Sequence, residues 1–265
     1  MRLIEERLET GALLKGYIHD TSQKMEMTFS MPAVVIFPGG SYERCSVRES
    51  EPVALAFMAR GYNAFTVEYL TGERPLGIRP LLDAAAAVKA VKCNSGRWNV
   101  NREKIVTVGF SAGGHLVGWL GNVCGDGKLS EMCGIDPEKS RPAAQVLCYP
   151  VITSGEYGHR GSFDMLFGDG EPCCGASLEE SVSPLTPPSF IWAGGEDMTV
   201  PPVNSLLFAE RLARSGVKYE LHVFSKGGHG LSLALEYTAR PEKYVESWFA
   251  MCVEFLDELF KTMKK

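Results

Sequence analysis

The 265-residue sequence has no excess of basic residues and no long apolar run. Its 27 lysine and arginine residues against 32 aspartate and glutamate residues give a net charge of −5, so we expect no nucleic-acid partner. The longest unbroken apolar run, Val53 to Ala59, has seven residues, whereas a membrane-spanning helix needs about 20. The charged start, Met1 to Arg7, lacks the apolar segment of a secretory signal. We therefore expect a cytoplasmic protein that does not enter a membrane.

The sequence also lacks any Cys-x-x-Cys pair, although it contains eight cysteines. Cys173 and Cys174 are neighbours, a poor geometry for bonding to each other, and Cys148 and Cys252 stand in apolar segments. This scatter argues against a zinc site or a redox motif. We expect reduced thiols, most of them acting as small buried hydrophobes. No cofactor and no metal is predicted.

What the sequence does contain is short apolar runs alternating with helical patterns. Its 45% hydrophobic and 22% charged residues suit a globular fold, and no repeat or linker divides it, so one domain over 1–265 is predicted. The predicted strands cover 33–37, 62–69, 105–109, 145–149, 189–193 and 219–224. The predicted helices cover about 48–60, 81–93, 112–123, 203–215 and 243–262. Two antiparallel edge strands are expected near 13–18 and 24–29. This alternation predicts an α/β fold with a mostly parallel sheet flanked by helices on both faces.

A Gly-x-Ser-x-Gly motif, Gly109 to Gly113, follows the predicted strand 105–109 and opens the helix 112–123. In this position the motif is typical of a nucleophile elbow, a strained strand-to-helix turn whose flanking glycines avoid clashes. Ser111 is therefore the candidate nucleophile. The alternative is a glycine-rich turn whose serine only caps the helix.

A nucleophilic serine needs a base, and the chain has five histidines. His229 lies in a glycine-rich loop after the last predicted strand, at the edge where open parallel sheets bind ligands, and is the candidate base. His115 stands four residues after Ser111, and we expect it to pack or bond locally. His19 and His222 are interpreted as structural or surface residues. His159 is interpreted equally as a pocket residue or as a solvated loop residue.

The base needs an orienting carboxylate. Asp197 follows the predicted strand 189–193, where its side chain can reach His229, and is the candidate acid. Glu196 is a rival, and an acid from the preceding loop would be Asp164 or Asp169.

A developing oxyanion needs backbone N–H donors. One is expected from Ala112, directly after the nucleophile. The second is expected from the loop after strand 33–37, with Gly39 and Gly40 as the candidates and Ser41 as an alternative. The resulting order Ser111, Asp197, His229 is that of α/β-hydrolases rather than of chymotrypsin or subtilisin.

Several stretches together resemble the compact bacterial acetyl xylan esterase-like subfamily of the α/β-hydrolases, over roughly residues 30 to 260. These stretches are Pro38–Tyr42, Glu51–Ala54, Gly61–Phe65, Gly109–Leu116, Tyr149–Ile152, Thr186–Phe190 and Gly227–Leu231. The resemblance implies the α/β-hydrolase fold and a serine carboxylic-ester hydrolase that removes O-acetyl groups from carbohydrate, in particular acetylated xylo-oligosaccharides. Its partner would be a small acylated sugar. The sequence departs from many relatives at Ser41, where they have a third glycine, and at Ala193-Gly194, where they commonly have His-Thr.

Other interpretations stay open at this point. They are a peptidase of the prolyl oligopeptidase type, a broad small-ester esterase, and a hydrolase-fold binding protein without catalysis. The segment 153–185 is interpreted either as a lid or specificity loop, or as a surface excursion that packs on its own hydrophobes. The oligomeric state is not defined by the sequence.

Overall fold

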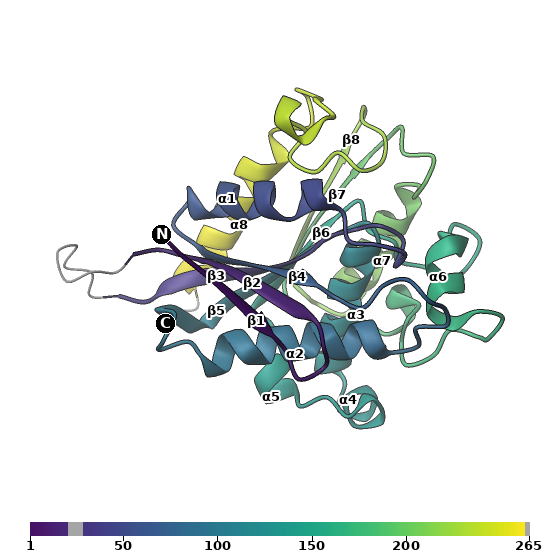
Figure 1. Ribbon diagram of the computed structural model, residues 1–265. Coiled ribbons are helices and arrows are strands. Elements are labelled where there is room, and N and C mark those ends of the chain that lie inside the picture. The colour runs from purple at the N-terminus through teal and green to yellow at the C-terminus, as the bar shows by residue number, and fades with distance from the viewer. Residues whose placement is uncertain (21–28, 263–265) are drawn as a thin grey trace.

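An eight-stranded sheet runs through the molecule in the order β1-β2-β4-β3-β5-β6-β7-β8 (Figure 1). The structure is a computed structural model that describes residues 1–20 and 29–262. The strands are β1 (Arg2–Arg7), β2 (Leu13–Ile18), β3 (Met31–Phe37), β4 (Asn63–Glu68), β5 (Val100–Phe110), β6 (Ala144–Cys148), β7 (Ser189–Gly194) and β8 (Tyr219–Phe224). The strands from β4 to β8 in this order pair in parallel, and β2 pairs antiparallel with both β1 and β4. The predicted α/β class is confirmed.

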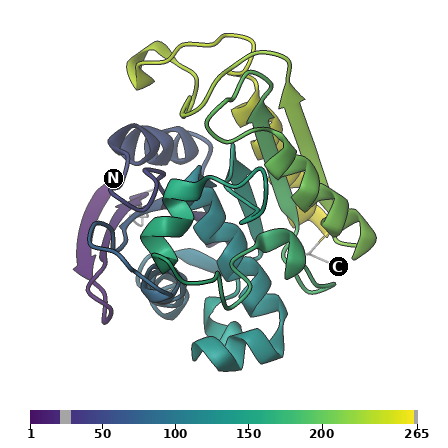
Figure 2. The ribbon, with the colours of Figure 1, turned by 90° about the vertical axis from the view of Figure 1, so that its right-hand side faces the viewer.

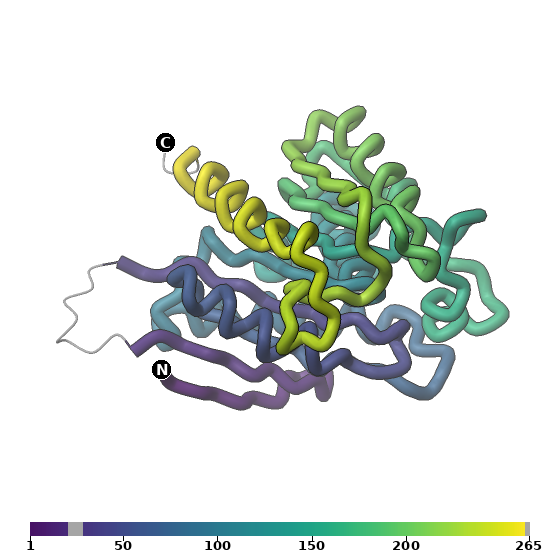
Figure 3. Tube along the Cα trace, turned by 90° about the horizontal axis from the view of Figure 1, so that it is seen from above, coloured from purple at the N-terminus to yellow at the C-terminus, as the bar shows by residue number. Residues whose placement is uncertain are grey.

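Helices cover both faces of this sheet (Figures 1 and 3). One face carries α1 (Glu51–Met58) and α8 (Trp248–Thr262), and the other carries α2 (Arg79–Cys93), α3 (Ala112–Gly125) and α7 (Val203–Arg214). Alternate residues of β3 divide accordingly: Val34 and Ile36 join the core under α1 and α8, and Val35 and Phe37 join the other core. Both faces are buried, which explains why the strands read as continuous apolar runs.

The remaining helical elements are short and lie in the connections. They are η2 (Val47–Glu49), α4 (Gly127–Cys133), α5 (Pro137–Ser140), α6 (Arg160–Phe167), η3 (Leu178–Glu180) and η4 (Glu236–Thr238). Within residues 1–20 and 29–262, none of the helices combines the length and apolarity that crossing a bilayer requires.

Several boundaries differ from the prediction, among them the start of β5, which lies at Val100 rather than at 105. The first helix begins at Glu51 rather than near 48, because Val47–Glu49 forms a separate tight turn and proline stands in the first turn of α1. The last helix begins at Trp248 rather than near 243. The predicted edge strand 13–18 is β2, but its outer partner is β1, and most of the range 24–29 lies outside the described residues.

All eight cysteines are free thiols. Only four of them are buried, fewer than predicted: Cys124, Cys133, Cys148 and Cys252. The others stand in loops and at a helix end, where the apolar character of their sequence neighbours does not determine burial.

The segment 153–185 packs on α3 at the edge where the strands end (Figure 2). Phe163 and Leu166 of α6 are buried in the core that α3 shares. Side chains of α3 also donate to backbone carbonyls of the segment: Trp119 Nε1 to Cys174 at 2.7 Å and Asn122 Nδ2 to Leu178 at 2.9 Å. The segment is therefore part of the main core rather than an excursion that packs only on itself.

Asn204 of α7 is expected to be important for holding the start of this segment. Its Oδ1 accepts from the backbone N–H groups of Ile152 at 3.0 Å and Thr153 at 3.2 Å, and the side chain is fully buried. Asn204→Ala leaves both donors unpaired, so we expect the free energy of unfolding to fall by about 2 to 4 kcal/mol in urea titrations. Leu206→Ala, at a half-exposed position of the same helix, should cost about 1 kcal/mol or less. Equal losses in the two variants would contradict this role.

Candidate active site

Ser111 stands at a sharp turn between β5 and α3. Its backbone adopts φ 53° and ψ −117°, a region that non-glycine residues rarely occupy. The turn also brings backbones together: a Cβ on Gly113 would lie 2.1 Å from the carbonyl oxygen of Phe37 at the end of β3. Only glycine fits there. This local geometry is the one that the Gly-x-Ser-x-Gly motif predicts.

Ser111, His229 and Asp197 form a chain of hydrogen bonds. Ser111 Oγ lies 2.7 Å from His229 Nε2, and His229 Nδ1 lies 2.6 Å from Asp197 Oδ2. Because Asp197 accepts the Nδ1 proton, Nε2 is left to accept the Ser111 hydroxyl proton. Ser111 and Asp197 are buried, and the His229 side chain is 19% exposed. This is the arrangement that a serine nucleophile with an adjacent base requires.

Asp197 is itself held in place by the loop after β7. Its Oδ1 accepts the backbone N–H groups of Thr199 and Val200, both at 2.9 Å. The rival carboxylates are exposed. Glu196 accepts from the Gly227 N–H at 3.2 Å. Asp164 is an exposed residue of α6, and Asp169 lies just beyond the end of that helix. Asp197 is therefore the carboxylate that the structure brings to His229.

The other histidines lie apart from this chain. His19 Nε2 is 3.1 Å from the Met58 carbonyl, and His222 pairs with Glu220 on β8. His159 caps the N-terminus of α6, where its Nδ1 accepts from the Ser162 N–H at 3.3 Å, so its ring proton is on Nε2. Partial burial, followed by the nearby charge of His229, lowers the pKa of His159. His159 is thus near the site but outside its hydrogen-bond chain.

The loop after β3 approaches Ser111 closely, and one predicted donor in it is wrong. The Gly39 N–H donates to Glu49 Oε2 at 2.8 Å, so it is not directed at a substrate. Gly39 has a different use: a Cβ there would lie 2.7 Å from the Phe110 carbonyl oxygen and 3.0 Å from Ser111 Cβ. The next residue, Gly40, has φ 127° and keeps its N–H outside the hydrogen bonds of the described residues, as does Ser41.

Ala112 is the first residue of α3, so its N–H has no partner within the helix. The N-terminal end of a helix also favours negative charge. Ala112 and Gly40 therefore remain as the donor pair beside Ser111, with Ser41 as the alternative upstream donor.

Two buried residues at the site were missed by the sequence reasoning. Tyr149 directly follows β6, and its ring packs edge-on against His229 with ring centroids 5.1 Å apart. Its position after a strand was a usable signal, because the same edge carries the other site residues. Glu49, the acceptor for Gly39, has no such signal, because it lies in a turn that reads as the start of a helix.

His115 links the loop after β3 to the segment 153–185, and it is fully buried as expected for a packed residue. Its Nδ1 lies 2.7 Å from the Tyr42 hydroxyl, and its Nε2 lies 2.7 Å from the Ala176 carbonyl. A neutral ring satisfies both contacts, with Nδ1 accepting and Nε2 donating.

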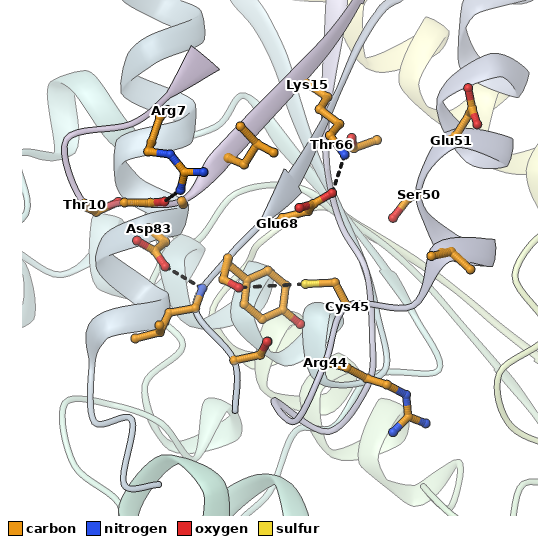
Figure 4. Close-up of a pocket in the computed structure, with 17 residues that line it drawn as sticks. Arg7, Thr10, Lys15, Arg44, Cys45, Ser50, Glu51, Thr66, Glu68 and Asp83 are labelled. Carbon is orange, nitrogen blue, oxygen red and sulfur yellow. Dashed lines mark hydrogen bonds and ion pairs between the residues drawn. The ribbon is translucent and has the colours of Figure 1, made fainter. Parts of the chain in front are cut away.

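A cavity of about 730 Å³ lies behind the loop after β3, lined by residues that include Arg44, Cys45 and Ser50 (Figure 4). Neither Ser111 nor His229 lines it. Some of its charged groups are already paired: Lys15 with Glu68 at 2.5 Å, and Asp83 with the Leu70 N–H at 2.7 Å (Figure 4). Ser111, His229 and Asp197 therefore lie outside this cavity.

Two family models match the chain. The BD-FAE model matches residues 20–149, which contain Ser111, and the prolyl oligopeptidase family model matches residues 176–262, which contain Asp197 and His229. The three residues of the hydrogen-bond chain are thus divided between the two matched regions.

Individual relatives are esterases and xylan-degrading enzymes. Endo-1,4-beta-xylanase B of Butyrivibrio fibrisolvens is 37% identical over 231 residues, covering 83% of this chain and 35% of that protein. Acetylxylan esterase of Xylanibacter ruminicola is 27% identical over 243 residues, covering 88% of this chain and 45% of that protein. The chain therefore spans less than half the length of these two relatives. The crystal structure of an acetyl ester-xyloside bifunctional hydrolase from Caldicellulosiruptor lactoaceticus matches with a TM-score of 0.81 and 37% identity, over 94% of this chain and 88% of that one.

The buried His115 predicts a loss of stability in acid. Burial lowers its pKa to about 4 from the ordinary 6.5. Below pH 6.5 the unfolded chain takes up a proton that the folded chain does not, so this contribution to stability is present at neutral pH and is lost as pH falls toward 4. Between pH 7.5 and 4.5 the effect amounts to about 2 to 3 kcal/mol.

The measurement compares urea unfolding at the two pH values in the wild type and in His115→Gln. The drop in unfolding free energy should be smaller in His115→Gln by about this amount. Leu206→Ala, which changes no titratable group, serves as the control and should keep the wild-type drop. An identical drop in His115→Gln and the wild type would contradict the assignment.

Proposed function

The chain belongs to the acetyl xylan esterase-like α/β-hydrolases, and we propose that it removes O-acetyl groups from small acylated sugars by a Ser-His-Asp acyl-enzyme mechanism. The observation that carries the proposal is the hydrogen-bond chain from Asp197 through His229 to Ser111. Acetylated xylo-oligosaccharides are the proposed substrates, supported by the acetylxylan esterase and acetyl ester-xyloside hydrolase among the relatives.

In the acylation step, Ser111 Oγ attacks the ester carbonyl carbon while His229 Nε2 takes the hydroxyl proton. Asp197 holds the ring in the required tautomer and stabilises the imidazolium that forms. The tetrahedral intermediate then collapses, the carbon–oxygen bond to the sugar breaks, and His229 returns the proton to the departing alkoxide. The product is an acetyl ester of Ser111.

The negative charge on the carbonyl oxygen needs donors that are already in place. The N–H of Ala112, at the N-terminus of α3, and that of Gly40 are the proposed donors. Deacylation repeats the same steps with water as the nucleophile, because His229 again acts as the base and Ser111 is the leaving group. No metal is required by this scheme.

A peptidase of the prolyl oligopeptidase type would use the same residues, since the prolyl oligopeptidase family model covers the region with Asp197 and His229. The two readings differ in the leaving group, a sugar alkoxide against an amine. Comparing acetylated xylobiose with aminoacyl-proline amides separates them, and the ester should be the preferred substrate. Preferred cleavage of the amide would replace the esterase proposal.

Asp197→Asn is expected to lower kcat on nitrophenyl acetate by roughly 10⁴-fold, because an amide favours the wrong tautomer of His229. Ser111→Ala serves as the blank and should also lose labelling by a fluorophosphonate probe. The matched control is Glu196→Gln, next to Asp197 but exposed, which should stay within about 3-fold of wild type. If Glu196→Gln is the crippled variant, the acid is misassigned.

The acyl group should be short. An acetyl group offers one methyl to bind, so a site built for it has little room for a longer chain. Where room exists, each added methylene gains about 0.8 kcal/mol, and where it does not, the chain clashes. We expect kcat/KM to fall from acetate to butyrate to octanoate nitrophenyl esters. A rise toward octanoate would indicate an esterase for lipid-like substrates instead.

A further inference from the structure

Glu49 is a buried carboxylate that the proposed mechanism does not use. Its residue is 3% exposed, and it ends the short turn η2 between the loop after β3 and α1. Burying a charged group is costly unless it is paired or hydrogen-bonded. The charge of Glu49 therefore depends on its hydrogen-bond partners.

Both oxygens of the Glu49 carboxylate accept hydrogen bonds. Oε2 accepts the Gly39 N–H at 2.8 Å, and Oε1 accepts the Tyr149 hydroxyl at 2.8 Å. The Tyr149 oxygen in turn accepts the backbone N–H of Ser232 at 2.8 Å, so the phenol proton is free to point only at Glu49. Two donors facing two oxygens match an ionised carboxylate.

These two donors belong to the two halves of the site. Gly39 precedes the proposed oxyanion donor Gly40 and touches the Ser111 elbow. Tyr149 packs its ring against His229 at 5.1 Å between centroids. One carboxylate thus links the loop that carries the proposed oxyanion donor to the ring that packs on His229. The two residues that it joins, Gly39 and Tyr149, are 110 residues apart in the sequence.

The surroundings of Glu49 set its charge. Burial raises its pKa, and the hydrogen bonds from Tyr149 and Gly39, then the charges of His229 and Arg48, oppose that rise. Tyr149 faces it from the end of β6, His229 from the loop after β8, and Arg48 from its own turn. The attraction between Glu49 and a charged His229 is mutual, so an ionised Glu49 also favours the imidazolium.

We propose that Glu49 is a positioning residue of the esterase site, whose ionised carboxylate orients the Gly39–Gly40 peptide toward the oxyanion and holds Tyr149 against the catalytic histidine. This inference rests on the proposed function. The same shape without the charge should not be sufficient, because a neutral amide has one acceptor oxygen for two donors, so either the Gly39 N–H or the Tyr149 hydroxyl loses its acceptor.

The test is Glu49→Gln, assayed with nitrophenyl acetate over a range of pH. We expect kcat to fall by about 10- to 100-fold, with KM changed by less than about 3-fold, because the loss is one of alignment in the transition state. The acid limb of the kcat/KM profile should move to lower pH, because the imidazolium loses a nearby negative charge. Glu51→Gln is the matched control: it removes an exposed carboxylate two residues away and should match wild type in both readouts.

Tyr149→Phe provides an independent arm that keeps the ring beside His229. It removes one of the hydrogen bonds that favour the ionised carboxylate, so Glu49 takes up a proton more readily and offers less negative charge to His229. The acid limb should therefore move to lower pH, as in Glu49→Gln, but by less. Movement to lower pH in both variants, larger in Glu49→Gln, supports the positioning role. A purely structural role would lower thermal stability in both variants and leave the acid limb of the folded fraction unchanged, which would overturn the inference.

Fluorophosphonate titration counts the folded, reactive Ser111 in each sample, so kcat is expressed per competent site. If the wild type is active and Glu49→Gln keeps kcat within about 3-fold of it, the inference about Glu49 is overturned and the proposed function stands. A wild type that neither hydrolyses esters nor reacts with the probe overturns the proposed function instead. The two failures are therefore distinguishable.

Discussion

The close approach of the end of β3 to the start of α3 is the constraint on which the rest of the site depends. At Gly113 there is no room for a side chain beside the Phe37 carbonyl, and at Gly39 there is none beside the Phe110 carbonyl. The two backbones therefore touch on both sides of Ser111. This contact places Ser111 and the N–H groups of two separate strand ends within one small volume, before any side chain contributes.

Much of the fold and part of the site could be predicted because their signals are local. Runs such as 33–37 and 105–109 are apolar throughout, since both faces of the sheet are covered, and each is followed by residues that break the strand. Parallel strands carry their ends to one edge, so Ser111, Asp197 and His229 could be grouped without knowing any distance. The structure places these three in hydrogen-bond contact.

The rest depends on contacts between distant segments, which leave no local pattern. The Gly39 N–H was assigned to the oxyanion because its loop has the right position, but its true partner, Glu49, is set by a turn ten residues later. Likewise, Ser232 N–H directs the Tyr149 hydroxyl from 83 residues away. Propensity and spacing describe which backbone groups are near a site, but the partner of each group is decided by tertiary packing.

The attachment of the segment 153–185 to α3 has a consequence for which side chains the segment can carry. His115, Trp119 and Asn122 each bind a carbonyl of the segment, and a carbonyl is present whatever the residue. The route of the segment over the sheet edge is thus determined in part by side chains of the helix behind it. Residues 174, 176 and 178 can therefore be exchanged for others of similar size while these hydrogen bonds are retained, so side chains of this segment can be replaced on an unchanged α3.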